Sequence, residues 1–77
     1  MKRELPDRIT IDPLVMSGHP CIRGMRVTVS SVLRLLAAHH DATRILQAYA
    51  YLEPEDIDAC IAYAAVLANE RELEVPA

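Results

Sequence analysis

The chain has 77 residues, enough for one small domain with a modest core, so we expect association with another chain to supplement its stability. Its 52% of apolar residues excludes a disordered tail, and its two cysteines are too few for a disulfide-stapled secreted scaffold. The opening letters MKRELPDR lack the apolar core of a signal peptide, and no apolar run approaches the roughly 18 residues of a membrane-spanning helix. We therefore expect a cytoplasmic protein without membrane association.

Charge divides the chain into two halves of opposite sign. Residues 1–44 carry seven basic against four acidic residues, a net charge of +3, whereas residues 45–77 carry one basic against seven acidic residues, a net charge of −6. The field of nucleic acid phosphates acts on every charge within about a Debye length. A nucleic acid could meet the first half but would be repelled by the second, so we expect DNA to be a secondary partner.

The first third of the chain, residues 8–29, predicts a short β arm. The stretches RITID and RVTV alternate isoleucine or valine with threonine, as half-buried strands do. Three prolines remove backbone donors, so no helix is expected before about Thr28. The expected arrangement is a hairpin or β-arch with a turn at Ser17–Gly18, a strand through Cys21–Ile22, a turn at Arg23–Gly24 and a strand at Met25–Val29.

Residues 30–70 predict a core of three helices. The first begins where Thr28 or Ser30 can cap it, carries apolar side chains at helical spacing, and ends near the two histidines that precede Asp41. Asp41 is a suitable cap for a short second helix. Together with residues 71–77 as a tail, these elements form a single domain, 1–77, of the mainly α class.

The third helix, expected from Pro54 to about Glu70, is apolar on every side. Asp58 is the only charged residue between Ile57 and Ala68. A helix that is apolar all round must be covered all round, so we expect a second chain to cover it. The alternative is a central helix wrapped entirely by its own chain. The residues expected to face a partner on this helix are Ala59, Ala62, Tyr63 and Val66.

Residues that could carry chemistry do not combine into a catalytic or metal site. Cys21 follows His19 by two positions, but Pro20 between them disfavours a regular strand that would pair the thiol with the imidazole. We interpret Cys21 as a packing residue and Cys60 as part of the core. There is no paired-cysteine zinc knuckle, and Gly24 is not followed by the lysine of a phosphate-binding loop. We expect no enzymatic activity, no cofactor and no metal.

Arg23 and Arg26 flank Gly24 and form the most suggestive polar pair. A tight turn could present both guanidinium groups together and bind a partner's carboxylate or a phosphate. The alternatives are two solvated charges or an internal bond to Asp12 or Glu53.

Three helices with a short middle one also suggest a helix-turn-helix, whose last helix would enter the major groove. That helix offers Asp58, Ala59 and Ala62, where base recognition needs arginine, lysine, asparagine or glutamine. Any DNA contact is therefore expected from arginines elsewhere in the chain: Arg8, Arg23, Arg26, Arg34 and Arg44.

Two long stretches, RITIDPLVMSGHPCIRGMRVTVSSVLRLLA and AYLEPEDIDACIAYAA, resemble the domain-of-unknown-function 433 family. The resemblance implies a small prokaryotic protein with a homeodomain-like helix-turn-helix fold and a β extension. Many family members look like antitoxins encoded beside a PIN-like ribonuclease toxin. It therefore implies a non-enzymatic, homo-oligomeric interaction module of a type II toxin-antitoxin pair, with a DNA-binding transcriptional autoregulator as the alternative. Arg23 or Arg26 would reach the toxin's active-site carboxylates.

The chain departs from the family pattern at four positions. Met25 replaces a threonine, His40 a glycine after the first helix, Ala50 a proline in a turn, and Glu53 the threonine cap before Pro54. Losing the threonine cap weakens the start of the third helix by about 1 kcal/mol.

Overall fold

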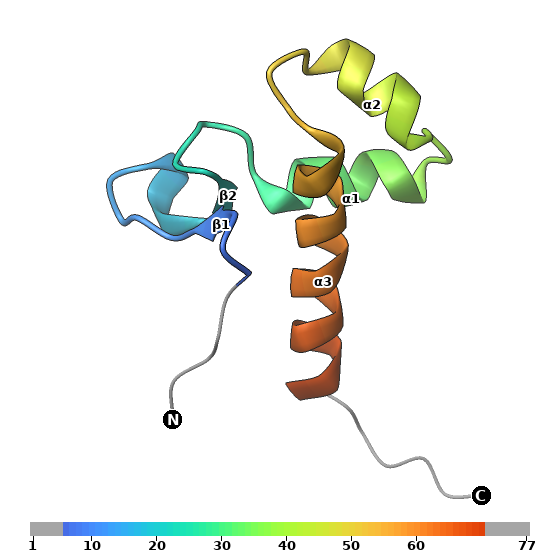
Figure 1. The fold of residues 1–77 in the computed structure, drawn as a ribbon. Coiled ribbons are helices and arrows are strands. Elements are labelled where there is room, and N and C mark those ends of the chain that lie inside the picture. Colours follow the sequence, from blue (N-terminus) through green and yellow to red (C-terminus); the bar gives the residue numbers. More distant parts are fainter. Residues whose placement is uncertain (1–5, 71–77) are drawn as a thin grey trace, which may run out of the picture.

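A small β unit precedes three helices in the computed structural model, which describes residues 6–70 (Figure 1). The predicted class, mainly α with a short N-terminal β arm, is confirmed. The predicted tail, residues 71–77, lies outside the described part. The elements in chain order are β1 (Ile9–Thr10), a 3₁₀ turn (Met16–Gly18), β2 (Cys21–Ile22), α1 (Val29–Ala37), α2 (Ala42–Ala48) and α3 (Pro54–Glu70).

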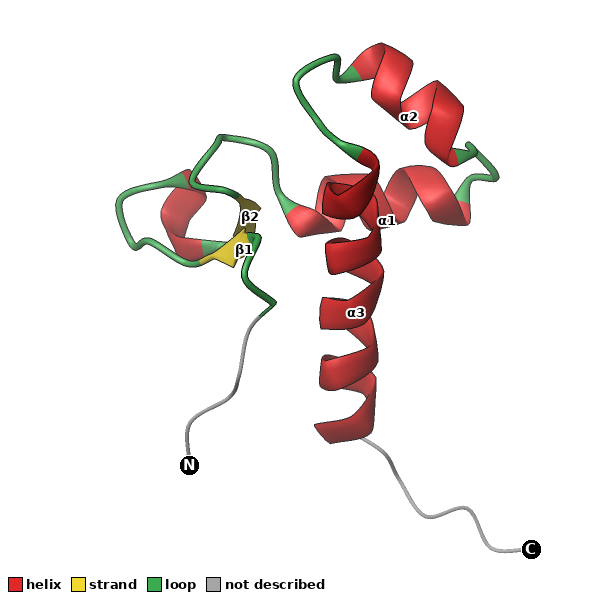
Figure 2. Cartoon of the chain, viewed as in Figure 1, coloured by secondary structure: helices red, strands yellow, loops and turns green. Residues whose placement is uncertain are grey.

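The two strands of the β unit are antiparallel and come from the two ends of a loop, not from one tight hairpin. Ile9 pairs with Ile22 and Thr10 with Cys21. The strand predicted at Met25–Val29 is wrong: only an isolated bridge joins Thr28 to Cys21. The reason is that Val29 already begins α1, which leaves too few residues for a strand. Figure 2 shows that most of this unit is loop.

A 3₁₀ turn occupies the place of the turn predicted at Ser17–Gly18. Ser17 has a φ of 57° and Gly18 a φ of 81°, so the chain reverses there through left-handed backbone angles. The expectation of no helix before Thr28 is corrected by this one short turn. Prolines before and after it prevent a longer helix.

The caps of α1 and α2 follow the prediction. The Thr28 hydroxyl accepts a hydrogen bond of 3.1 Å from the Ser31 amide, and Asp41 Oδ1 accepts one of 2.8 Å from the Arg44 amide. Each satisfies an amide that the first helical turn leaves without a partner.

The end of α1 is a Schellman motif. The amide of His40 donates to the Leu35 carbonyl and that of His39 to the Leu36 carbonyl, at 3.0 Å each. His39 has a φ of 68°, the left-handed conformation that favours glycine. The predicted helix end is confirmed, but the strained position is His39 and not His40, where the family glycine was placed.

The core lies where α1, α2 and the β unit meet the first half of α3. Ile22, Val32, Ile45 and Cys60, one from each of these elements, are fully buried. Figure 1 shows α3 crossing α1 and running on beyond it, while α2 lies on the other side of α1. The predicted first residue of α3, Pro54, is confirmed. None of the described helices is long and apolar enough to cross a membrane.

Burial changes along α3. Its own chain covers one side of the first half, burying Asp56, Ile57, Ala59 and Cys60, while Ile61 on another side is exposed. Further along, the covering side consists of the buried Tyr63 and the half-buried Ala64 and Leu67, and the other sides carry the exposed residues Ala62, Ala65 and Ala68. The described residues therefore cover one side of the first half of α3 and leave apolar side chains of its second half exposed.

Candidate functional site

A buried carboxylate at the start of α3 ties the β unit to the helices. Asp56 is 0% exposed, and it is the only buried charged side chain among residues 6–69. Arg23 approaches it with two nitrogens, Nε at 3.0 Å from Oδ1 and Nη2 at 2.8 Å from Oδ2. Arg8 donates to Oδ1 at 2.9 Å. The Glu53 amide donates to Oδ2 at 2.8 Å, so Asp56 also closes the first turn of α3.

Further bonds hold the two arginines in place. Arg8 donates to Glu53 Oε1 at 2.6 Å, and Arg23 Nη2 donates to the Tyr51 carbonyl at 3.0 Å. The Arg23 amide donates to the Arg8 carbonyl at 2.7 Å, which joins their backbones beside the β1–β2 pair. Arg23 has a φ of 48°, a left-handed backbone angle that is strained for a residue other than glycine. We call these four residues, Arg8, Arg23, Glu53 and Asp56, the ion cluster.

The electrostatics of the ion cluster favour the charged forms of its members. Burial alone would raise the pKa of Asp56, but hydrogen bonds from Arg23, the Glu53 amide and Arg8 outweigh it and lower this pKa to about 2. The pKa of Arg8 rises because it binds Glu53 and Asp56, and that of Arg23 rises because it binds Asp56. A carboxylate so fully hydrogen-bonded holds no proton at neutral pH and serves as a structural anchor.

The ion cluster corrects the prediction for Arg23. Its guanidinium group is not free beside Arg26 but is bound within the chain, and its acceptor is Asp56 instead of Asp12 or Glu53. Arg8, predicted to contact DNA, is engaged in the same way. Sequence reasoning placed Asp56 only at the helix N-terminus. Its position three residues after Glu53, where a capping-box residue lies, was the signal that could have found one of its bonds.

The remaining predicted arginines lie apart from the ion cluster. Arg26 belongs to the turn before α1, Arg34 to α1 and Arg44 to α2, and all three are exposed. With the side chains of residues 6–69 none of them forms an ion pair. The arginines predicted to contact nucleic acid thus divide into two that form ion pairs, Arg8 and Arg23, and three that form none among the described side chains.

The thiols lie in the core, as interpreted from the sequence. Cys21 is buried and its Sγ donates to the His19 carbonyl at 3.3 Å. Burial, and then the charge of Asp56, raises the pKa of the Cys60 thiol to about 11, so it stays protonated at neutral pH. Within the described part of the chain, no three histidine, cysteine or acidic side chains lie close enough to hold a metal ion.

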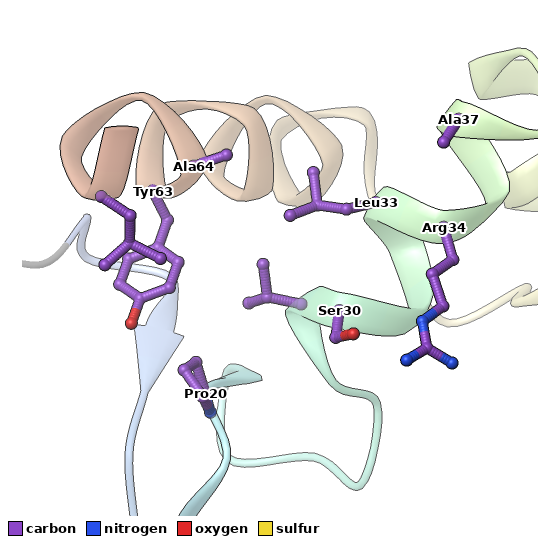
Figure 3. A pocket seen from close by; sticks show the side chains of 9 residues that line it. Pro20, Ser30, Leu33, Arg34, Ala37, Tyr63 and Ala64 are labelled. Atoms are coloured by element: carbon purple, nitrogen blue, oxygen red, sulfur yellow. The ribbon is translucent and has the colours of Figure 1, made fainter. Parts of the chain in front are cut away.

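An apolar groove of about 550 Å³ lies between α1, α3 and the loop before β2. Figure 3 shows Leu33 of α1 reaching toward Ala64 of α3. Pro20 lies on the side of the groove opposite α3, and the Tyr63 ring is directed toward Pro20. Arg34 lies at the other end of the groove from Tyr63. The lining residues are Pro20, Val29, Ser30, Leu33, Arg34, Ala37, Tyr63, Ala64 and Leu67.

The predicted partner-facing residues of α3 divide into two kinds. Ala62 is exposed and Val66 is half-buried, so both can meet another chain. Ala59 is only 8% exposed and belongs to the core, so its prediction is wrong. Tyr63 is 4% exposed and packs in the core as well, although its ring lines the groove. Helical spacing could not tell which side of an all-apolar helix its own chain would cover.

The fold and these sites define a small helical domain with a buried ionic anchor and an open apolar groove. The chain belongs to the family described as Protein of unknown function (DUF433), whose model matches residues 9–64. It is 38% identical over 56 residues to the Uncharacterized protein y4eO of Sinorhizobium fredii (strain NBRC 101917 / NGR234). That match covers 73% of this chain and 25% of the relative, so the chain spans about a quarter of that protein's length. No solved structure matches significantly.

Proposed function

We propose that this protein is a non-enzymatic interaction module, the antitoxin-like partner of a PIN-like ribonuclease toxin in a type II toxin-antitoxin pair. The observation that carries the proposal is the second half of α3, which projects from the core and leaves Ala62 exposed and Val66 half-buried. Apolar side chains on a projecting helix are stabilised when another protein removes them from water. The resemblance to antitoxins supplies the kind of partner.

The inhibitory contact uses the side of α3 that carries Ala62 and Val66. Small side chains there let the nuclease surface approach the helix backbone closely and block access of RNA to its active site. Arg26 is the arginine left to reach the nuclease carboxylates, because it is exposed while Arg23 is bound to Asp56. The proposal also places the protein in the cytoplasm, where its two free cysteines stay reduced.

The test is RNA cleavage by the nuclease encoded beside this gene, measured with increasing amounts of this protein. We expect Ala62→Glu and Val66→Glu each to weaken neutralisation at least tenfold, because a carboxylate would be buried in an apolar contact. Gln47→Glu adds the same charge at an exposed position of α2 and should neutralise like the wild type. Wild-type protein that leaves cleavage unchanged would contradict the proposal.

DNA-binding autoregulation is the second candidate function. Arg26, Arg34 and Arg44 favour it, since each is exposed and forms no ion pair with the side chains of residues 6–69. The exposed side of α3 offers Asp58 and alanines, which do not recognise bases. An electrophoretic shift of the gene's own promoter that weakens steeply with salt would support this function. No shift at low salt would exclude it for the protein alone.

A further inference from the structure

The groove between α1 and α3 has a definite chemistry. Apart from Ser30, Arg34 and the hydroxyl group of Tyr63, the side chains that line it are apolar. Arg34 is exposed and forms no ion pair with another residue in the described range, so it brings an uncompensated positive charge to one end of the groove. A fitting occupant therefore has a narrow apolar surface with an acidic residue near one end.

The chain itself carries such a surface on α3. Ile61, Ala65 and Ala68 follow one another at intervals of four and three residues, so they form a stripe along one side of the helix. Ile61 is 50% exposed, and the two alanines are exposed as well. Asp58, also exposed, lies one turn before Ile61 on the same side. We call these four residues the α3 stripe.

The α3 stripe borders the groove. Ala64 lines the groove, and Ala65 and Ala68 are its neighbours at the next position and one turn later. Both surfaces therefore occur on the same part of one helix. A two-fold axis beside α3 can place each copy's stripe against the other copy's groove, which gives a closed, self-complementary pair.

We infer that the groove is occupied by the α3 stripe of a second copy of this chain. The alanines let the two α3 helices approach closely while Ile61 fills the space between α1 and α3. Asp58 of each copy lies within reach of Arg34 of the other, which neutralises the charge at the end of the groove. The inference goes beyond the proposed function, because it uses a different side of α3 from the one that carries Ala62 and Val66.

Sedimentation equilibrium of the full chain between 1 and 100 µM, without nuclease, tests the inference. We expect a mass of twice the 8.6 kDa chain at the upper concentration. Ala65→Glu should weaken self-association at least tenfold, whereas the matched control Gln47→Glu should leave it unchanged. A wild-type monomer at 100 µM, or an Ala65→Glu variant that associates like the wild type, would overturn the inference.

A charge exchange tests the arrangement of the two copies. Arg34→Glu and Asp58→Arg should each weaken association about fivefold or more, because each places like charges together at the end of the groove. The double variant restores opposite charges and should associate more tightly than either single variant. A double variant no tighter than the singles would overturn this arrangement. None of these measurements involves the nuclease, so their failure is distinguishable from failure of the proposed function.

Discussion

The two halves of α3 differ in which side chains they bury and which they expose. The first half buries a charge, Asp56, and the chain supplies every partner that this carboxylate needs. The second half carries apolar residues that the described chain leaves exposed, such as Ala65 and Ala68. One end of the helix is therefore complete within the molecule, and the other end is a surface for another chain.

The difference teaches what each kind of contact contributes. A buried ion pair adds little net stability compared with apolar residues of the same shape, because removing charges from water is costly. It does demand one arrangement, since breaking it leaves a buried charge without a partner. The ion cluster thus determines how the β unit docks on α3. The apolar half has no such directional requirement and can contribute about 25 cal/mol for each Å² that a partner covers.

Removing the buried carboxylate disrupts the ion cluster at the start of α3 and should have the largest effect on stability. Asp56→Ala removes the acceptor that Arg8, Arg23 and the Glu53 amide share, and water can replace it in part because both arginine side chains are about a third exposed, so we expect the free energy of unfolding to fall by about 2–3 kcal/mol. Urea unfolding followed by circular dichroism measures the change. The control Glu55→Ala, at the exposed neighbouring position, should change stability by about 0.5 kcal/mol or less. Similar losses in both variants would refute the anchoring role.

Lowering the pH should weaken the ion cluster in the first half of α3 without any mutation. The pKa of Asp56 in the folded protein, about 2, lies below the ordinary 3.8, so its contribution is complete above about pH 4. That contribution, about 2 kcal/mol, is lost as the pH falls from about 4 to about 2. Urea midpoints measured at intervals across this range should fall more steeply for the wild type than for Asp56→Asn. An equally steep fall of the urea midpoint for both proteins would show that Asp56 does not cause the acid dependence.

The same polar substitution in each half sharpens the contrast between them. Cys60→Ser places a hydroxyl at a position that is 0% exposed, and we expect it to cost about 1–2 kcal/mol. Ala65→Ser places it at an exposed position, where only the lower helix propensity of serine remains, about 0.5 kcal/mol. Chemical unfolding at low micromolar protein concentration compares the two. Equal costs would show that burial does not differ along α3 as described.

A glycine in the loop after α1 should have the smallest effect and leave both halves unchanged. His39→Gly relieves a φ of 68° at the end of a Schellman motif, so we expect stabilisation by about 0.5–1 kcal/mol. The thermal midpoint should rise, while the acid dependence assigned to Asp56 stays the same. His40→Gly, which relieves no such strain, is the control. Stabilisation by His40→Gly but not by His39→Gly would show that the strained backbone position is His40 and not His39.

Local signals predicted the helices well because each depends on residues that are neighbours in the sequence. Thr28 and Asp41 cap α1 and α2 through amides three residues away, and Pro54 begins α3, as predicted. The β unit was predicted less well. Alternation of apolar residues at 25–29 favoured a strand, but the cap at Thr28 started a helix first, and β2 paired with Ile9–Thr10 instead.

The sequence by itself determined the three helices, their ends and the excess of apolar residues on α3, since these follow from caps, prolines and spacing along the chain. Only the tertiary structure decided which side of α3 the chain covers and that Arg8 and Arg23 share Asp56. Those arginines precede it by 48 and 33 positions, so no local pattern encodes the contact. The physical reason is that a buried charge and an all-apolar helix each require partners, whereas only the folded chain determines which partners lie within reach.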